Sequence, residues 1–400
     1  MKLIRRNRYL GILKECRGTP DIKVITGIRR CGKSKLLDLF SDEIRKTEPR
    51  SNIIKINFNL AQFEEINEYH RLLEYVSKKY KPDTKNYLMI DEIQLCQGFE
   101  KAINSLHAEE KYDIYITGSN AFLSSSDLAT LFVGRTFEIP VFPFSFGEFL
   151  EYFPVQKSVY DSFDDYLRIG GMPGSYVYQR EERRRDYLNR DVLNALIIRD
   201  IVQKQHIRNI PLLEMLLDFL VSNIGSLLSV RNIEARLLQN GTKANKKTIQ
   251  SYIDYLTNAF AFYRMRRFDV KGKKYLQTDD KFYLADISFR YSLLGTKTLD
   301  YGHVLENVIA IELLRRGYEV YVGKLYRKEI DFVAIKENKR TYFQVAYSIS
   351  DETTLKRELE PLKAIKDNYS KILIARTYQP EYEIDGIQII DPSRWLLRDE

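Results

Sequence analysis

Eight consecutive residues near the start of the chain have the composition and spacing needed to hold a chain of phosphates. Glycines at positions 27 and 32 are followed by Lys33 and Ser34, which is the pattern G-x-x-x-x-G-K-[ST]. Because glycine lacks a β-carbon, such a loop wraps closely around phosphate oxygens, and its backbone N–H groups face them. Lys33 would reach the terminal phosphates, and the Ser34 hydroxyl would hold Mg²⁺. We predict that the nucleotide is cradled by Gly27, Ile28, Arg29, Arg30, Cys31, Gly32, Lys33, Ser34 and Lys35.

A pair of carboxylates supplies the second half of such a site. Residues 87–90 read as a buried strand, and Asp91 and Glu92 follow at its end. Because open parallel sheets bind ligands at the carboxyl ends of their strands, we expect this pair beside the phosphate loop. Asp91 would hold Mg²⁺ through water, and Glu92 would polarise the attacking water as a general base. The two motifs together predict hydrolysis of ATP with Mg²⁺.

Two further segments carry candidates for contacts to the γ-phosphate. Residues 112–117 read as a strand, and Ser119 or Asn120 just after it would contact the γ-phosphate or the attacking water. An ordinary polar turn is an equally good interpretation. Arg135 precedes another strand, residues 137–141, and would act as an arginine finger in cis or from a neighbouring subunit. The alternative is a solvated surface arginine.

Together these motifs resemble the AAA-superfamily ATPases of bacteria and archaea that carry a C-terminal nuclease-like domain of unknown function. The resemblance rests on residues 27–34, 88–92, 117–120, 134–135 and 143–149, and it spans nearly the whole chain. It implies an ATPase core with the acidic pair beside Mg²⁺, a sensor near Ser119 and Asn120, and a role for Arg135. It names no substrate.

Length and composition set bounds on the architecture. The 400 residues, 44% hydrophobic and 30% charged, predict two or three globular domains. The longest apolar runs fall short of a membrane span, and no signal peptide is evident. Cys16, Cys31 and Cys96 form neither a paired framework nor a metal-type spacing, so we expect a reducing cytoplasm. The net charge of +8 permits a nucleic-acid partner without establishing one.

The order of the expected elements predicts an α/β chain in four parts. Residues near 1–20 read as a lead-in helix, and residues 21–150 alternate strands and helices, which predicts that residues 1–150 form a P-loop AAA core with a parallel sheet and helices on both faces. Residues 151–208 read as a helical small domain, 209–298 as a winged-helix-like domain, and 299–400 as an α/β domain. Residues 170–174 hold three glycines around a proline and cannot continue a helix. They resemble a turn that relays nucleotide state in the family, or they are a bare turn.

The third part contains the pattern of a DNA-binding module. Three helical patterns between residues 212 and 256, followed by two strands around a basic loop, are typical of a winged helix, whose third helix enters the major groove. Candidate contacts to double-stranded DNA are Lys246, Lys247, Lys273 and Lys274. Winged helices also bind proteins, so a protein partner or a homo-oligomer stays open.

The last part resembles the restriction-endonuclease-like PD-(D/E)xK fold, in which acidic residues and a lysine gather around Mg²⁺. Glu306, Asp331 and Gln344 match the first three positions, but Ala346 stands where the lysine is required. A methyl group neither takes a proton nor carries charge, so we expect phosphodiester cleavage to be badly impaired. Either a lysine from elsewhere substitutes, or the domain is a retired nuclease used for binding or docking, which is the interpretation we favour.

The sequence therefore predicts a cytoplasmic, Mg²⁺-dependent AAA-type ATPase that acts as a switch or a motor. Two alternatives stay open: an ATP-gated metal-dependent nuclease and a nucleotide-dependent DNA-binding scaffold.

Overall fold

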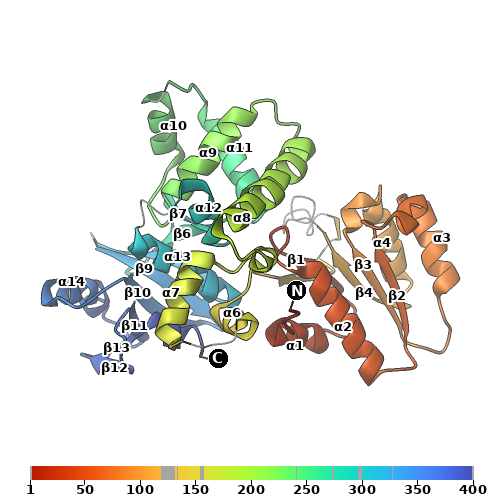
Figure 1. Cartoon of the computed structure of the whole chain (residues 1–400), viewed down its shortest axis with the longest axis horizontal. Helices are drawn as coiled ribbons and strands as arrows, with labels where there is room; N and C mark the ends of the chain where they lie inside the picture. The colour runs from red at the N-terminus through yellow and green to blue at the C-terminus, as the bar shows by residue number, and fades with distance from the viewer. Residues whose placement is uncertain are drawn as a thin grey trace. The chain divides into compact units, whose positions relative to one another are not determined.

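A computed structural model describes residues 2–118, 131–132, 134–153, 157–239, 241–272, 274–295, 300–326 and 328–398 (Figure 1). The chain divides into two compact units. The first comprises Met1–Val141 and Ile198–Lys204, and the second comprises Phe142–Ile197 and Gln205–Glu400. Among the described residues, none of the helices combines the length and the apolar character that a membrane crossing requires.

The first unit is built on a five-stranded parallel sheet with the order β2-β3-β4-β1-β5. Its elements are α1 (Asn7–Glu15), β1 (Ile22–Thr26), α2 (Lys33–Thr47), β2 (Asn52–Asn57), η1 (Ala61–Ile66), α3 (Tyr69–Lys79), β3 (Asn86–Asp91), η2 (Ile93–Leu95), α4 (Phe99–Ala108), β4 (Tyr112–Thr117) and β5 (Thr136–Pro140). Every residue of β1 and β3 is buried, as expected for strands covered on both faces. Helices α3 and α4 lie over one face of the sheet, and α1 and α2 lie over the other (Figure 1). The predicted α/β core with a parallel sheet is confirmed.

The second unit contains an eight-stranded mixed sheet with the order β12-β13-β11-β10-β9-β8-β6-β7. Its strands are β6 (Phe262–Asp269), β7 (Lys274–Leu284), β8 (Glu319–Leu325), β9 (Lys328–Lys336), β10 (Lys339–Ala346), β11 (Ser370–Ala375), β12 (Tyr382–Ile384) and β13 (Ile387–Ile390). Strand β6 pairs in parallel with β8, with Arg267 opposite Val322. The two strands expected as a separate wing therefore extend the C-terminal sheet.

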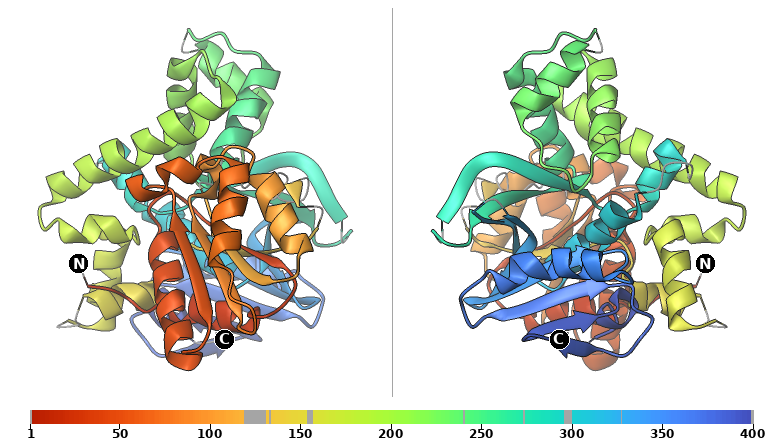
Figure 2. Two further views of the ribbon diagram at one scale, coloured as in Figure 1. Left: turned by 90° about the vertical axis from the view of Figure 1, so that its right-hand side faces the viewer. Right: turned by 90° about the vertical axis from the view of Figure 1, so that its left-hand side faces the viewer.

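The helices of the second unit fall into two groups. One group comprises α12 (Ser288–Leu294), α13 (Tyr301–Arg315), α14 (Glu352–Lys363) and α15 (Pro392–Trp395), with α6 (Phe146–Tyr152), α7 (Val159–Ile169), η3 (Pro173–Val177), α8 (Glu181–Asp186) and the π-helical segment η4 (Tyr187–Leu193) earlier in the chain. The next π-helical segment, η5 (Leu196–Gln203), passes from the second unit into the first, because Ile198–Lys204 belongs to the first unit. The other group is α9 (Ile210–Ser222), α10 (Val230–Gln239) and α11 (Lys246–Asn258), which pack together as the green bundle in Figure 2. These three helices lie close to where the sequence predicts them.

The glycine-rich turn at residues 170–174 is explained by close packing within the second unit. A β-carbon on Gly170 would lie 2.3 Å from an oxygen of Asp286, and one on Gly171 would lie 2.2 Å from the carbonyl oxygen of Phe144. The Asp286 carboxylate accepts a hydrogen bond from the Gly171 N–H at 2.6 Å. Only glycine leaves room for these contacts, so packing by itself accounts for the two residues.

Candidate nucleotide-binding site

The phosphate loop connects β1 to α2 and turns through three left-handed backbone positions. The φ angles of Gly27, Arg30 and Gly32 are 137°, 63° and 107°. A β-carbon on Gly27 would lie 2.1 Å from the carbonyl oxygen of Val141, so this position requires glycine. Helix α2 begins at Lys33, which places its first unpaired N–H groups at the end of the loop. The predicted strand–loop–helix arrangement is present.

Lys33 and Ser34 both point toward the carboxyl edge of the sheet. The Lys33 side chain is buried, and its ammonium donates to the carbonyl oxygens of Gly27 at 2.6 Å and Ile28 at 3.2 Å. The Ser34 hydroxyl donates to a carboxylate oxygen of Asp91 at 3.0 Å. The structure thus brings Ser34 of the loop and Asp91 together as predicted, and the Lys33 ammonium lies against the backbone carbonyls of the loop.

Asp91 ends β3 and is held by hydroxyl groups on two sides. Burial raises the pKa of its carboxyl, while hydrogen bonds from Thr117 and Ser34 oppose that shift. Thr117, at the end of the neighbouring strand β4, donates to the carboxylate oxygen that Ser34 also contacts. A serine hydroxyl beside a carboxylate is the kind of oxygen donor set that Mg²⁺ accepts together with phosphate oxygens and waters.

Glu92 adopts an unusual backbone conformation for a residue with a side chain. Its φ and ψ are 56° and 48°, and its N–H donates to the Thr117 hydroxyl at 3.2 Å. Its carboxylate accepts from the Gln94 side chain at 2.5 Å. A non-glycine residue in the left-handed region is uncommon, and such strain gathers at functional sites. Thr117 therefore fixes both carboxylate residues, a role that the spacing of the motif did not predict.

Three other residues were predicted to contact the γ-phosphate: Ser119, Asn120 and Arg135. Ser119 and Asn120 lie outside the described residues. Arg135 is exposed, and its carbonyl oxygen accepts from the N–H of Ile22, the first residue of β1. The phosphate loop follows the other end of β1, about 16 Å away for a strand of five residues. Arg135 therefore does not reach the phosphate loop of its own chain, which leaves the contact to a neighbouring subunit or the solvated arginine.

Two charged residues that contact the loop, Arg6 and Asp200, were not predicted from the sequence. The guanidinium of Arg6 donates to the carbonyl oxygen of Cys31 at 3.0 Å. The guanidinium of Arg29 lies 3.4 Å from a carboxylate oxygen of Asp200, on the segment Ile198–Lys204 that belongs to the first unit. Neither partner could be found from local spacing, because each contact joins residues far apart in the chain.

The nuclease-like positions in the second unit surround a lysine. Lys281 of β7 lies 2.8 Å from carboxylate oxygens of both Glu306 and Glu329. Burial alone would lower the pKa of Lys281, but Glu306, Asp331 and Glu329 raise it. Burial and the charge of Glu306 raise the pKa of Asp331 well above its usual range.

Gln344, the third nuclease-like position, donates to Glu358 of α14 at 3.1 Å. Among the described residues, no group of three or more histidine, cysteine, aspartate or glutamate side chains is arranged to hold a metal ion.

The candidate DNA contacts divide between α11 and the β6–β7 turn. Lys246 and Lys247 open α11 as exposed residues, and the Lys246 ammonium lies 3.7 Å from a carboxylate oxygen of Glu234 on α10. Lys273 lies outside the described residues, and Lys274 begins β7. A hollow between α10 and α11 is lined by Arg231, Leu238, Lys243 and Lys246 among others.

The parallel sheet and the loop between β1 and α2 define the first unit as a P-loop nucleotide-binding fold. Residues 19–150 match the model of a family described as an AAA domain, and residues 160–300 match a domain of unknown function, DUF8612. The chain is 38% identical to an uncharacterized protein of Haemophilus influenzae over 99% of both chains. It is 30% identical to the uncharacterized protein MJ1544 of Methanocaldococcus jannaschii, over 86% of this chain and 79% of that protein. The chain belongs to the family of these two proteins.

Among solved structures, the chain is similar to a Walker-type ATPase of Pyrococcus abyssi. The sequence identity is 16%, the TM-score is 0.48, and the match covers 73% of this chain and 96% of that one.

Proposed function

We propose that the protein binds ATP with Mg²⁺ and hydrolyses it at the carboxyl edge of the five-stranded sheet. The observation that carries the proposal is the meeting of the Ser34 hydroxyl and the Asp91 carboxylate at 3.0 Å beside the phosphate loop. Ser34 and Asp91 would hold Mg²⁺, which supplies charge neutralisation on the β- and γ-phosphates. Lys33 would exchange its two carbonyl partners for phosphate oxygens, and Glu92 would accept a proton from the attacking water.

The test is phosphate release from ATP by the wild type, Lys33→Ala and Glu92→Gln. We expect Lys33→Ala to lose turnover and nucleotide affinity, and Glu92→Gln to bind ATP but to hydrolyse it poorly. Glu64→Gln, an exposed carboxylate on η1, is the matched control and should behave as the wild type. Full turnover in Lys33→Ala would refute the site, and full turnover in Glu92→Gln would remove Glu92 from the mechanism.

We further propose that Arg135 acts on the nucleotide of a neighbouring subunit in a homo-oligomer. Its distance from its own phosphate loop supports this arrangement over a contact in cis. If Arg135 acts in trans, mixing Arg135→Ala with Lys33→Ala should restore turnover, because the second variant supplies arginine to the intact loops of the first. Additive activities without restoration would leave Arg135 as a surface residue.

We also propose that the helices α9–α11 bind double-stranded DNA. The support for this proposal is the position of Lys246 and Lys247 at the exposed start of α11. Binding through these residues should weaken steeply as salt rises, and it should weaken further when Lys246 and Lys247 are both replaced by alanine. A flat salt response would contradict it. DNA-stimulated ATP turnover would make the protein a DNA-linked switch or motor, and indifference to DNA would favour a protein partner.

For the C-terminal cluster, we propose a retired nuclease centre rather than an active one. The supporting observation is that the Lys281 ammonium already pairs with Glu306 and Glu329, so it offsets part of the negative charge that would attract a metal ion. Supercoiled plasmid should remain intact with the wild type in Mg²⁺ or Mn²⁺. Nicking that disappears in Glu306→Gln would overturn this proposal and establish the ATP-gated nuclease instead.

A further inference from the structure

A buried guanidinium lies against the phosphate loop from outside the motif. Arg6 directly precedes α1, its residue exposure is 4%, and its guanidinium donates to the Cys31 carbonyl oxygen at 3.0 Å. The same guanidinium lies 4.5 Å from the centre of the Tyr9 ring. Burying an arginine is costly unless its charge and hydrogen bonds are satisfied, so its position against the loop requires an explanation.

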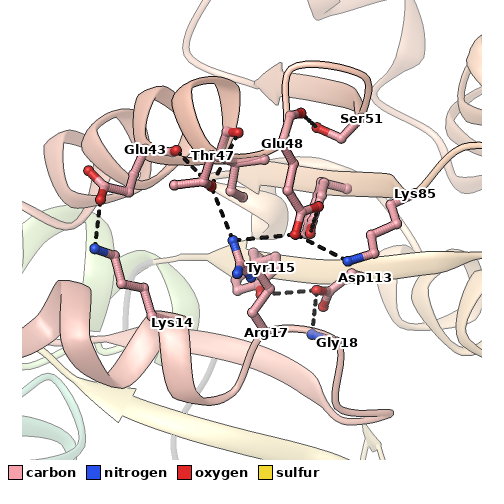
Figure 3. Close-up of polar contacts among 12 residues, drawn as sticks. Lys14, Arg17, Gly18, Glu43, Thr47, Glu48, Ser51, Lys85, Asp113 and Tyr115 are labelled. Atoms are coloured by element: carbon pink, nitrogen blue, oxygen red, sulfur yellow. Dashed lines mark hydrogen bonds and ion pairs between the residues drawn. The ribbon is translucent and has the colours of Figure 1, made fainter.

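Helix α1 is fixed along its whole length, so Arg6 is held in place. On its inner side Tyr9, Leu10 and Leu13 are buried. At its far end the Lys14 ammonium lies 2.6 Å from a carboxylate oxygen of Glu43 (Figure 3). Just beyond the helix, the polar network of Figure 3 continues through Arg17, Gly18, Thr47, Glu48 and Asp113.

The contact between Arg6 and the Cys31 carbonyl also sets the direction of the next N–H group, that of Gly32. In a planar trans peptide, the carbonyl of one residue and the N–H of the next point in opposite directions. Because the Cys31 carbonyl points at Arg6, the Gly32 N–H points away from Arg6. Gly32 is the last loop residue before α2, and its φ of 107° is readily available only to glycine.

We propose that Arg6 is a positioning residue of the nucleotide site: by holding the Cys31 carbonyl outward, it aims the Gly32 N–H at a phosphate of the bound nucleotide. The inference rests on the proposed ATP-binding function. It assigns to Arg6, outside the motif, a part in shaping the loop that binds the phosphate chain.

The test uses variants that suit the backbone of residue 6. Its φ and ψ are 54° and 55°, a left-handed conformation that glycine and asparagine tolerate. Arg6→Gly and Arg6→Asn therefore remove the guanidinium with little backbone strain. Arg5→Gly is the matched control, because the neighbouring Arg5 is exposed and pairs with Glu43 on α2.

The measurement is the affinity for ATP, ADP and inorganic pyrophosphate, together with turnover at saturating ATP. We expect both Arg6 variants to bind all three ligands about tenfold more weakly, the cost of a poorly aimed charge-assisted hydrogen bond. Turnover at saturation should stay close to the wild type, because Arg6 does not touch the reacting atoms. Guanidinium ion at millimolar concentration should restore affinity in Arg6→Gly and leave the wild type unchanged.

The outcomes separate this inference from the proposed function. If the wild type binds neither ATP nor pyrophosphate, the proposed function fails. If the wild type binds them and both folded Arg6 variants bind equally well, only the role of Arg6 is overturned. Weaker binding that guanidinium does not restore, with a matching loss of thermal stability, would make Arg6 a purely structural residue and would also overturn the inference.

Discussion

Replacing Lys281 by methionine should destabilise the second unit, because it removes the cation from a buried charge cluster. The side chains of Lys281 and Glu306 are only 5% and 10% exposed, and their charged atoms lie 2.8 Å apart. Breaking a buried ion pair by removing one partner costs about 3–5 kcal/mol, since the other charge stays buried without compensation. Glu306 would keep the hydroxyl hydrogen bond from Tyr283 at 2.6 Å, so we expect the lower end, about 3 kcal/mol.

The assay is thermal unfolding of the full chain, supported by the urea midpoint. A loss of about 3 kcal/mol should lower the melting temperature by about 6–12 °C for a unit of this size. Lys328→Met is the control, because Lys328 pairs with Glu360 at 2.6 Å on the surface, where such pairs contribute about 0–1 kcal/mol. The double variant Lys281→Met with Glu306→Gln should recover part of the loss. A change in Lys281→Met no larger than that in the control would refute the reasoning.

Three further predictions concern Thr117, Gly171 and Asp331. Thr117→Val should slow ATP turnover about tenfold or more, measured as phosphate release, because Asp91 and Glu92 lose a shared hydroxyl partner; unchanged turnover would contradict it. Gly171→Ala should lower the free energy of unfolding by about 1–3 kcal/mol in urea, because its β-carbon meets a backbone carbonyl oxygen at 2.2 Å; wild-type stability would count against the packing argument. Asp331 has a raised pKa in the folded state, so its contribution to stability falls as pH rises above about 4, the value in the unfolded chain. Asp331→Asn should remove that loss, and an unfolding free energy with the same pH slope as the wild type would refute it.

The nucleotide site is the part of the molecule that the sequence predicts best, for a physical reason. Its ligands are the backbone of successive residues and the ends of neighbouring strands, so their spacing in the chain determines their spacing in space. The contact from Ser34 to Asp91 follows from the motif and the parallel sheet alone. Thr117 follows less directly, because the sequence places it at a strand end without saying which carboxylate it contacts.

The C-terminal sheet is predicted less completely, because strand partners are chosen by non-local pairing. Two strands around a basic loop predict a hairpin, and β6 and β7 pair as an antiparallel hairpin. Nothing within those two strands indicates that β6 will also pair with β8, more than fifty residues later in the chain. The edge of a hairpin presents free backbone groups to any strand that reaches it, so local patterns leave the partner open.

Lys281 shows why a search by motif spacing missed the cation of the nuclease-like cluster. The motif requires a lysine two residues after Gln344, where the chain has Ala346. A charge, however, acts through space, and residues two apart on a strand share a face. Lys281 and Tyr283 share such a face of β7, and both contact Glu306. A buried ammonium needs partners for its charge, because that charge is too costly to bury alone, and Glu306 and Glu329 supply them for Lys281. Both carboxylates come from other elements of the unit, so the spacing of residues within one motif does not reveal the contact.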